Sequence, residues 1–215
     1  MSIDKVSVDV RRWGMGNSGC ERITGDQALE RLLSGNRRYR DARPKHPNQT
    51  PDRRRELEDE QHPFAVILGC SDSRVPPEVI FDQGLGDLFI IRVAGNVVDN
   101  MVLGSIQYAV SYLRTPLIMV LAHANCGAVS ATLSAHHPLE GQLSCLTNAI
   151  QPAVDLVRDQ PGDTLNRASK ANAEMVAERL RNSKPVLFDS VRAGMLTVAA
   201  AYYNLGTGGV EILSQ

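Results

Sequence analysis

The sequence predicts an α/β protein with an open, mostly parallel β-sheet flanked by helices, an N-terminal helical arm and a C-terminal hairpin. Three short apolar runs carry this prediction, at residues 64–69, 87–93 and 117–121. Their aliphatic, partly β-branched composition is typical of buried strands. Stretches with helical spacing separate the runs, and strands that alternate with helices at this length indicate parallel βαβ units.

The size and composition of the chain are those of one domain. Its 215 residues, 43% of them hydrophobic, are enough to bury one sizeable core. We expect a single domain over 1–215, with a helical arm at 1–60 and the α/β core at 61–215. The net charge of -1 argues against binding to nucleic acid or to an anionic membrane surface, and no apolar run is long enough to cross a membrane.

The cysteines and the N-terminal residues indicate a cellular compartment. The four cysteines show no dense spacing pattern. That usage fits free thiols or metal binding in a reducing compartment better than a disulfide framework. Residues 1–12 carry scattered charges and lack the apolar segment of a secretory signal. We therefore expect a cytoplasmic protein.

Two helices are expected in the N-terminal arm. Thr24 and Gln27 have the spacing of a capping box, and apolar residues at helical spacing follow them, which predicts a helix over 25–40. A Thr-Pro pair then begins a second, highly charged helix over 52–60. The apolar stripe of the arm has no obvious partner within one small sheet domain, so we expect the arm to be needed for dimer formation.

The same patterns predict the remaining elements. Further helices are expected near 77–81, over roughly 100–113, from residue 126 onward, at 142–158 and at 163–182. We expect Pro152 to break or bend the helix in which it lies. Residues 196–203 and 210–213 flank a glycine-rich turn and predict the terminal hairpin.

Two polar clusters follow two of the predicted strands. Cys70 comes directly after the run at 64–69, and His123 and Cys126 come directly after the run at 117–121. Because ligands of open parallel sheets bind at the carboxyl ends of the strands, we expect these side chains to converge. Two thiolates and one imidazole suit zinc, and three protein ligands leave one position open for chemistry.

Two alternatives to a catalytic zinc site remain at this stage. The cysteines could be ordinary core residues that lie near a histidine by coincidence. The site could also be a closed structural zinc site, with Cys20 or Cys145 as a fourth ligand. Neither cysteine has the short spacing seen in zinc ribbons, so the three-ligand site is favoured.

Asp72 and Arg74 follow the first cysteine at alternate positions of a predicted loop. Their side chains can form a charge-assisted, bidentate pair. Held by Arg74 near zinc, Asp72 can accept a hydrogen bond from a hydroxide on the metal and so orient it toward an electrophile. If the pair opens, the Asp72 carboxylate can itself occupy the fourth zinc position. The alternative is an ion pair that only braces the loop.

Three segments together resemble the β-class carbonic anhydrases. These segments are Cys70–Glu78, Phe81–Asn96 and His123–Val129. The resemblance extends from about residue 25 to Val210, nearly the whole chain. It implies an enzyme that reversibly hydrates CO₂ to bicarbonate, with zinc held by the two cysteines and the histidine, and with the Asp-Arg pair as the orienting dyad.

The resemblance also implies a substrate pocket and an assembly. Gln61 would hydrogen-bond bicarbonate, and Phe89 and Tyr108 would line a narrow apolar pocket. In the family this pocket is completed across a homodimer or larger homo-oligomer, in which the N-terminal helices embrace the neighbour. The chain departs from the family at Ala122, where glycine is common, and at Ile67, where members with an allosteric bicarbonate pocket carry tryptophan.

Two other functions stay open. The same scaffold supports hydrolysis of a sulfur analogue of CO₂, such as carbonyl sulfide or carbon disulfide, and no motif separates the two reactions. The chain could instead be a non-catalytic module that binds zinc or bicarbonate. The presence of both Asp72 and Arg74 argues against such a module.

Overall fold

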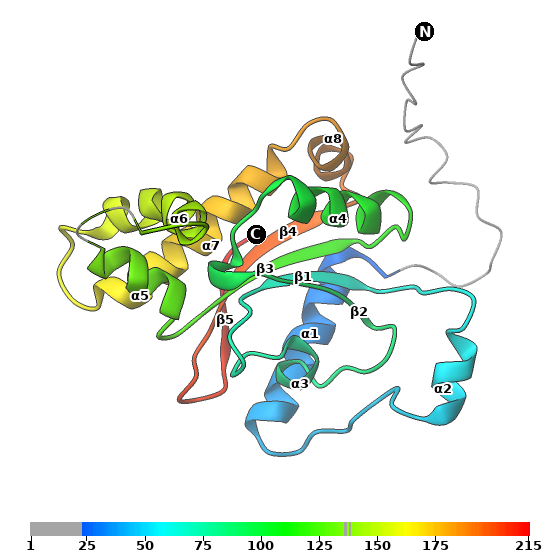
Figure 1. Cartoon of the computed structure of the whole chain (residues 1–215). Coiled ribbons are helices and arrows are strands. Elements are labelled where there is room, and N and C mark those ends of the chain that lie inside the picture. Colours follow the sequence, from blue (N-terminus) through cyan, green and yellow to red (C-terminus); the bar gives the residue numbers. More distant parts are fainter. Residues whose placement is uncertain (1–22, 136, 138) are drawn as a thin grey trace, which may run out of the picture.

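The computed structural model describes residues 23–135, 137 and 139–215. A five-stranded sheet with the strand order β2-β1-β3-β4-β5 lies at its centre (Figure 1). The strands are β1 (Ala65–Gly69), β2 (Leu88–Arg92), β3 (Leu117–His123), β4 (Thr197–Tyr203) and β5 (Val210–Ser214). Strands β1 to β4 pair in parallel, and only β5 runs antiparallel to its neighbour. The predicted fold class and the terminal hairpin are thereby confirmed.

Helices surround this sheet. They are α1 (Gly25–Arg40), α2 (Pro51–Glu56), α3 (Pro77–Ile80), α4 (Asn100–Ser111), α5 (Gly127–Ser134), α6 (Leu143–Val157), α7 (Thr164–Arg181) and α8 (Val186–Arg192), with a short 3₁₀ turn, η2, at Ala94–Asn96. None of the helices that the structure describes is both long and apolar enough to span a membrane.

The two faces of the sheet pack against different helices, as Figure 1 shows. In β3, Met119 and Leu121 belong to a core cluster with residues of α1, α3 and α6, whereas Ile118 and Val120 belong to a cluster with residues of α4 and α8. This alternation follows from the two-residue period of a strand. Helix α7 contributes to both clusters and runs along β3 and β4.

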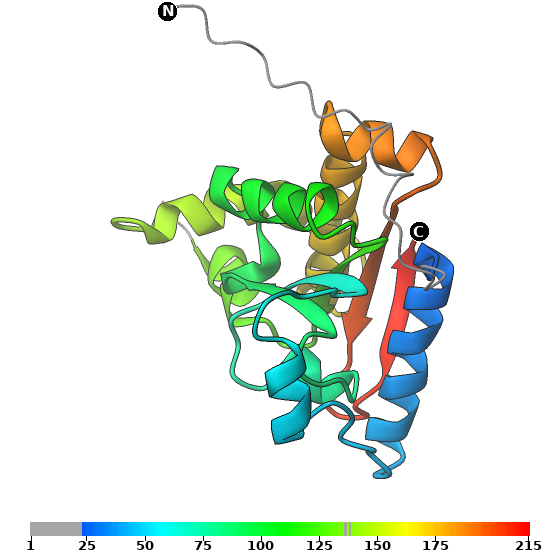
Figure 2. The same cartoon turned by 90° about the vertical axis from the view of Figure 1, so that its right-hand side faces the viewer.

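Helix α1 packs on the sheet of its own chain. Its apolar residues Ala28, Leu29 and Leu32 are buried in the core, and the helix lies beside β5 (Figure 2). The Asn36 side chain also donates to the Gly208 carbonyl and accepts from the Val210 amide in the hairpin. The expectation that the apolar stripe lacks a partner within one chain was therefore wrong for α1. The hairpin widens the sheet and gives α1 a surface to cover.

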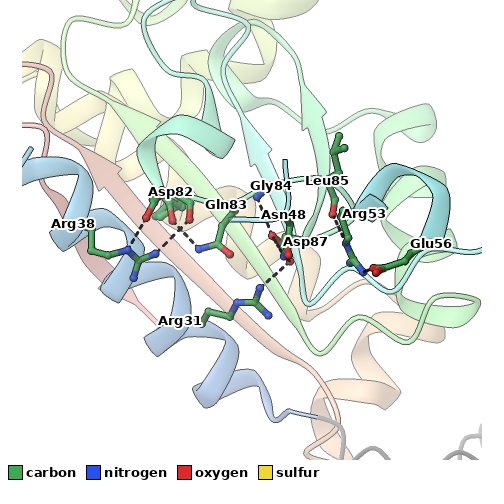
Figure 3. A network of polar contacts seen from close by, with 11 residues as sticks. Arg31, Arg38, Asn48, Arg53, Glu56, Asp82, Gln83, Gly84, Leu85 and Asp87 are labelled. Atoms are coloured by element: carbon green, nitrogen blue, oxygen red, sulfur yellow. Dashed lines mark hydrogen bonds and ion pairs between the residues drawn. The ribbon is translucent and has the colours of Figure 1, made fainter. Parts of the chain in front are cut away.

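Two buried carboxylates fasten α1 and the following loop to the segment before β2 (Figure 3). Asp82 accepts from Arg38 Nε at 2.5 Å and from the backbone amides of Lys45 and His46. Burial alone would raise the pKa of Asp82, but these hydrogen bonds outweigh it and lower the pKa. Asp87 in turn accepts from Arg31 at 2.8 Å, from Asn48 and from the Gly84 amide.

Some helix boundaries differ from those predicted. Helix α6 continues through Pro152, although a proline inside a helix removes one backbone hydrogen bond. Buried neighbours on either side, Ile150 and Ala153, keep this stretch packed on the core. Helix α2 ends at Glu56 and buries no residue, and α8 was not predicted because its seven residues are too few for helical spacing to show.

Candidate metal centre

The three predicted zinc ligands come together at the carboxyl end of the sheet. Cys70 is the first residue after β1, His123 ends β3 and Cys126 is the N-cap of α5. Strands β1 and β3 are parallel neighbours, which brings their carboxyl ends side by side. All three residues are buried, and their ligand atoms lie within 4.8 Å of one another. We call these three residues the metal cluster.

The His123 ring leaves one nitrogen for a ligand. Its Nδ1 lies 2.9 Å from the Ala124 carbonyl oxygen, to which it donates. This bond assigns the lone pair to Nε2, which is buried and has no hydrogen-bond partner among the described residues. An unpaired buried acceptor is costly, and a cation between the cluster atoms would satisfy it. The donor set therefore fits a zinc ion.

The two buried sulfurs shift each other's pKa in opposite directions. A hydrogen bond from the Cys126 thiol lowers the pKa of Cys70, and the hydrogen bond from the Gly95 amide lowers it further. The same contact, together with burial, raises the pKa of Cys126. A divalent cation beside both sulfurs would stabilise them as thiolates.

The third cysteine that the structure describes is not part of the metal cluster. Cys145 is exposed in α6, where its Sγ lies 3.6 Å from Gln142 Oε1. Cys20 lies outside the described residues. Of the residues that the structure describes, the metal cluster is the one group of histidine, cysteine and carboxylate side chains close enough to share a metal ion. Three ligands with an open position are typical of catalytic zinc.

Asp72 and Arg74 form the predicted bidentate pair. Arg74 Nε lies 2.9 Å from Asp72 Oδ1, Nη2 lies 2.7 Å from Oδ2, and the Arg74 amide also donates to Oδ1. These hydrogen bonds hold the pKa of Asp72 well below its usual range, so the carboxylate is ionised. Arg74 Nη2 also donates to the carbonyl of Asn125, which lies between two cluster residues in the chain. Asp72 itself lies outside the metal cluster, and its place as a ligand stays a prediction.

Arg92 is a site residue that the sequence reasoning missed. From the end of β2, its Nε donates to the Cys70 carbonyl at 3.0 Å and its Nη2 to the Asp72 carbonyl at 2.6 Å. One guanidinium therefore holds the backbone of the loop that carries both side chains. A signal was available, because Arg92 is the charged residue at the carboxyl end of a predicted strand, at the same sheet edge as Cys70.

The predicted substrate-binding residues lie at the opposite end of the sheet. Phe89 pairs with Val66 near the start of β1, and the Tyr108 ring centroid is 6.2 Å from that of Phe89. Tyr108 and Gln61 line a groove of about 570 Å³. Strand β1, five residues or about 17 Å long, separates this region from Cys70. Within one chain, the predicted site residues therefore lie in two separate groups, and the roles of Gln61, Phe89 and Tyr108 stay predictions.

The known proteins that are similar to this chain all point to one family. The family described as Carbonic anhydrase matches residues 65–210. A carbonic anhydrase of Mycolicibacterium smegmatis is 42% identical over 193 residues, which cover 87% of this chain and 92% of that protein. Carbonic anhydrase 2 of Mycobacterium tuberculosis is 41% identical over 187 residues, with 84% and 89% covered.

Solved structures point the same way. A structure from a study of two tetrameric β-carbonic anhydrases of Sordaria macrospora has a TM-score of 0.71 and 26% identity, and covers 86% of this chain and 96% of its own. The Coccomyxa β-carbonic anhydrase in complex with acetazolamide has a TM-score of 0.69 and 26% identity, with 86% of each chain covered. The chain therefore belongs to the β-carbonic anhydrases, a family of enzymes whose general reaction is the hydration of CO₂.

Proposed function

We propose that this enzyme reversibly hydrates CO₂ to bicarbonate and a proton at a zinc ion held by Cys70, His123 and Cys126. The observation that carries the proposal is the buried metal cluster with the unpaired Nε2 of its histidine. Bound there, zinc would act as a Lewis acid that makes a water nucleophilic near neutral pH. CO₂ is small and apolar, so it needs little more than a narrow apolar space beside that position.

The Asp72 carboxylate would orient the nucleophile. It is ionised at neutral pH, because hydrogen bonds from Arg74 lower its pKa. Asp72 Oδ1 accepts from both Arg74 Nε and the Arg74 amide, but Oδ2 accepts only from Arg74 Nη2 among the described residues. Oδ2 therefore keeps a lone pair, with which Asp72 can still accept a hydrogen bond from the attacking group. Arg74 would hold the carboxylate in this position, and Arg92 would fix the loop beneath it through two backbone carbonyls.

We also propose that the complete site needs two chains. Gln61, Phe89 and Tyr108 would bind bicarbonate and line the apolar pocket of a neighbouring subunit. Their separation from Cys70 along β1 supports this role, since they do not reach the metal cluster of their own chain. Tyr108 is 47% exposed and so has surface to offer a partner. A homodimer or larger homo-oligomer would then be the active form.

We further propose a domain organisation and a cellular location for this enzyme. The whole chain would act as one domain, because α1 of the N-terminal arm packs on the core that carries the metal cluster. The enzyme would work in the cytoplasm, where a reducing environment keeps the ligand thiols free.

Stopped-flow measurement of CO₂ hydration, with metal analysis of the same sample, tests the proposal. We expect about one zinc per chain, and a hydration rate that falls when a chelator removes the metal and returns when zinc is restored. Turnover of carbonyl sulfide and carbon disulfide should be measured beside it. Full zinc loading with no acceleration of CO₂ hydration would contradict the proposal, as would a preference for a sulfur analogue.

A further inference from the structure

Helix α7 carries a buried asparagine close to the metal cluster. Asn172 is 2% exposed, and its Nδ2 donates to the carbonyl of Gly95 at 2.8 Å. Its neighbours on α7 are mainly small apolar residues, namely Ala168, Ala171, Ala173 and Ala177. A carboxamide is costly to bury in such surroundings unless it is hydrogen-bonded. The hydrogen bond to Gly95 therefore offsets the cost of burying the Asn172 side chain.

Gly95 in turn contacts the metal cluster. Its amide donates to Cys70 Sγ, with the nitrogen 3.4 Å from the sulfur. Its φ of +69° lies in the left-handed region, and a Cβ at this position would lie 2.6 Å from Ile150 Cδ1. Only glycine fits here without strain. The peptide before Gly95 is thus tied to the sulfur and the peptide after it to Asn172, so the two bonds together fix the orientation of this turn.

We propose that Asn172 is a positioning residue for the Cys70 thiolate. By holding the Gly95 carbonyl, Asn172 aims the Gly95 N–H at the sulfur. The inference rests on the proposed function, in which Cys70 is a zinc ligand. A hydrogen bond to a thiolate withdraws electron density from the sulfur, which then donates less to the metal and leaves it a stronger Lewis acid. In a site with two thiolates, which offset the charge of Zn²⁺, this effect favours activation of water.

The matched control is Ser169, which lies on the same helix. It is 1% exposed, and its Oγ donates to the Leu165 carbonyl within α7, not to a residue at the site. Asn172→Ala and Ser169→Ala each remove one buried polar group from α7. If Asn172 only stabilised the helix, both variants should lose stability, and neither should change the electronic character of the Cys70 sulfur.

The test uses the full chain loaded with Co²⁺, whose thiolate ligands give a charge-transfer absorption in the near ultraviolet. Asn172→Ala should shift this band, because the Cys70 sulfur would lose its hydrogen bond and donate more strongly. It should also weaken zinc binding by about tenfold, because Cys70 would no longer be held in position for the metal. Ser169→Ala should keep the wild-type band and affinity. A wild-type band and affinity in Asn172→Ala would overturn the proposal.

A second measurement keeps the proposal testable if Asn172→Ala does not fold. In ¹¹³Cd-loaded wild-type protein, a hydrogen bond to a metal-bound sulfur transmits scalar coupling from the metal to the amide proton. We expect a ¹H–¹¹³Cd correlation to the Gly95 amide, and its absence would overturn the proposal. A wild-type protein without any thiolate-to-Co²⁺ band would instead contradict the zinc site itself, so the two failures are distinguishable.

Discussion

At the scale of single residues, His123 and Cys70 of the metal cluster each make a hydrogen bond to the backbone and still have an atom that can bind a metal. His123 donates through Nδ1, and Cys70 accepts from the Gly95 amide. The atoms left over, Nε2 and the two sulfurs, are buried and lie together. Leaving a buried acceptor without a partner costs about 1–3 kcal/mol. A bound cation removes that cost, which makes metal loading the first property to test.

Cys126→Ser should lose most of the bound zinc and most of the activity, because a hydroxyl is a poor substitute for a thiolate ligand. Cys145→Ser is the matched control and should change neither, since Cys145 is exposed and lies outside the metal cluster. Zinc per chain and the CO₂ hydration rate should be measured for both. Undiminished zinc and activity in Cys126→Ser would refute the ligand assignment, whereas loss of zinc in Cys20→Ser would favour a structural site with Cys20 as a fourth ligand.

Arg74→Ala should lower activity by about 10–100-fold, although within the described part of the chain the Arg74 side chain bonds only to Asp72 and a backbone carbonyl. Without Arg74 the pKa of Asp72 rises toward its usual value, which is still far below neutral. The carboxylate thus stays ionised but loses its position, and it can take the open ligand place.

The pH dependence separates this effect from a simple loss of stability. Activity should rise with pH, because the nucleophile forms by loss of a proton. In Arg74→Ala the loss should be largest at lower pH, where the freed carboxylate competes best. Asp72→Asn should also be slow, but it lacks the charge that closes the site. Zinc coordination by X-ray absorption should accompany both rate profiles. Wild-type activity and pH dependence in Arg74→Ala would show that the Asp72–Arg74 pair only stabilises the loop.

At the scale of elements, α1 packs on the sheet that carries the metal cluster. Leu32 is fully buried against the core, and the Tyr39 and Tyr203 hydroxyls lie 3.2 Å apart, which links the end of α1 to the end of β4. Tyr203 pairs in register with His123 on β3. Helix α1 therefore belongs to the framework that places the histidine, in addition to any role it has between subunits.

Leu32→Ala should destabilise the protein by about 2–5 kcal/mol, the usual cost of truncating a buried leucine. Leu156→Ala, at a position on α6 that is 63% exposed, should cost less than about 0.5 kcal/mol. Urea denaturation at one fixed protein concentration measures both values. Equal stabilities for the two variants would contradict the observed packing of α1 on its own sheet.

The sequence was sufficient to predict the elements whose signals are local. Apolar runs predicted β1, β2 and β3, and the hairpin segment 196–203 predicted β4. Cys70 and His123 were recognisable because each lies at a strand end. The partner of α1 was not predictable, because Gly208, which Asn36 contacts, is 172 residues away in the chain. Arg92 was marked by its place at a strand end, but the backbone carbonyls to which it donates were not predictable. Asn172 donates to a carbonyl 77 residues away, and no spacing in a single sequence reveals such a contact.

At the scale of the whole molecule, the predicted site residues fall into two groups at opposite ends of β1. Mixed assemblies test whether two chains share them. Cys126→Ser lacks a metal ligand but keeps Gln61, and Gln61→Ala keeps the metal cluster. In a mixed dimer with a shared site, one of the two sites combines an intact metal cluster with an intact glutamine.

Co-expression of these two variants should therefore restore activity to about a quarter of the wild-type level if dimers form at random. Each variant expressed alone should remain slow. The hydration rate of the purified mixture is the measurement, with separately purified and unmixed variants as the control. Activity no higher than the sum of the separate variants would mean that Gln61 does not serve the site of a neighbouring subunit.

The central claim, a zinc ion held by two cysteines and one histidine, is tested most directly by X-ray absorption at the zinc edge of the purified wild-type protein. We predict two sulfur ligands at about 2.3 Å and one imidazole nitrogen at about 2.0 Å, with the remaining position filled by a light atom. A shell of three or four sulfurs, or one with no sulfur, would contradict the assignment of Cys70, His123 and Cys126 as the complete set of cysteine and histidine ligands.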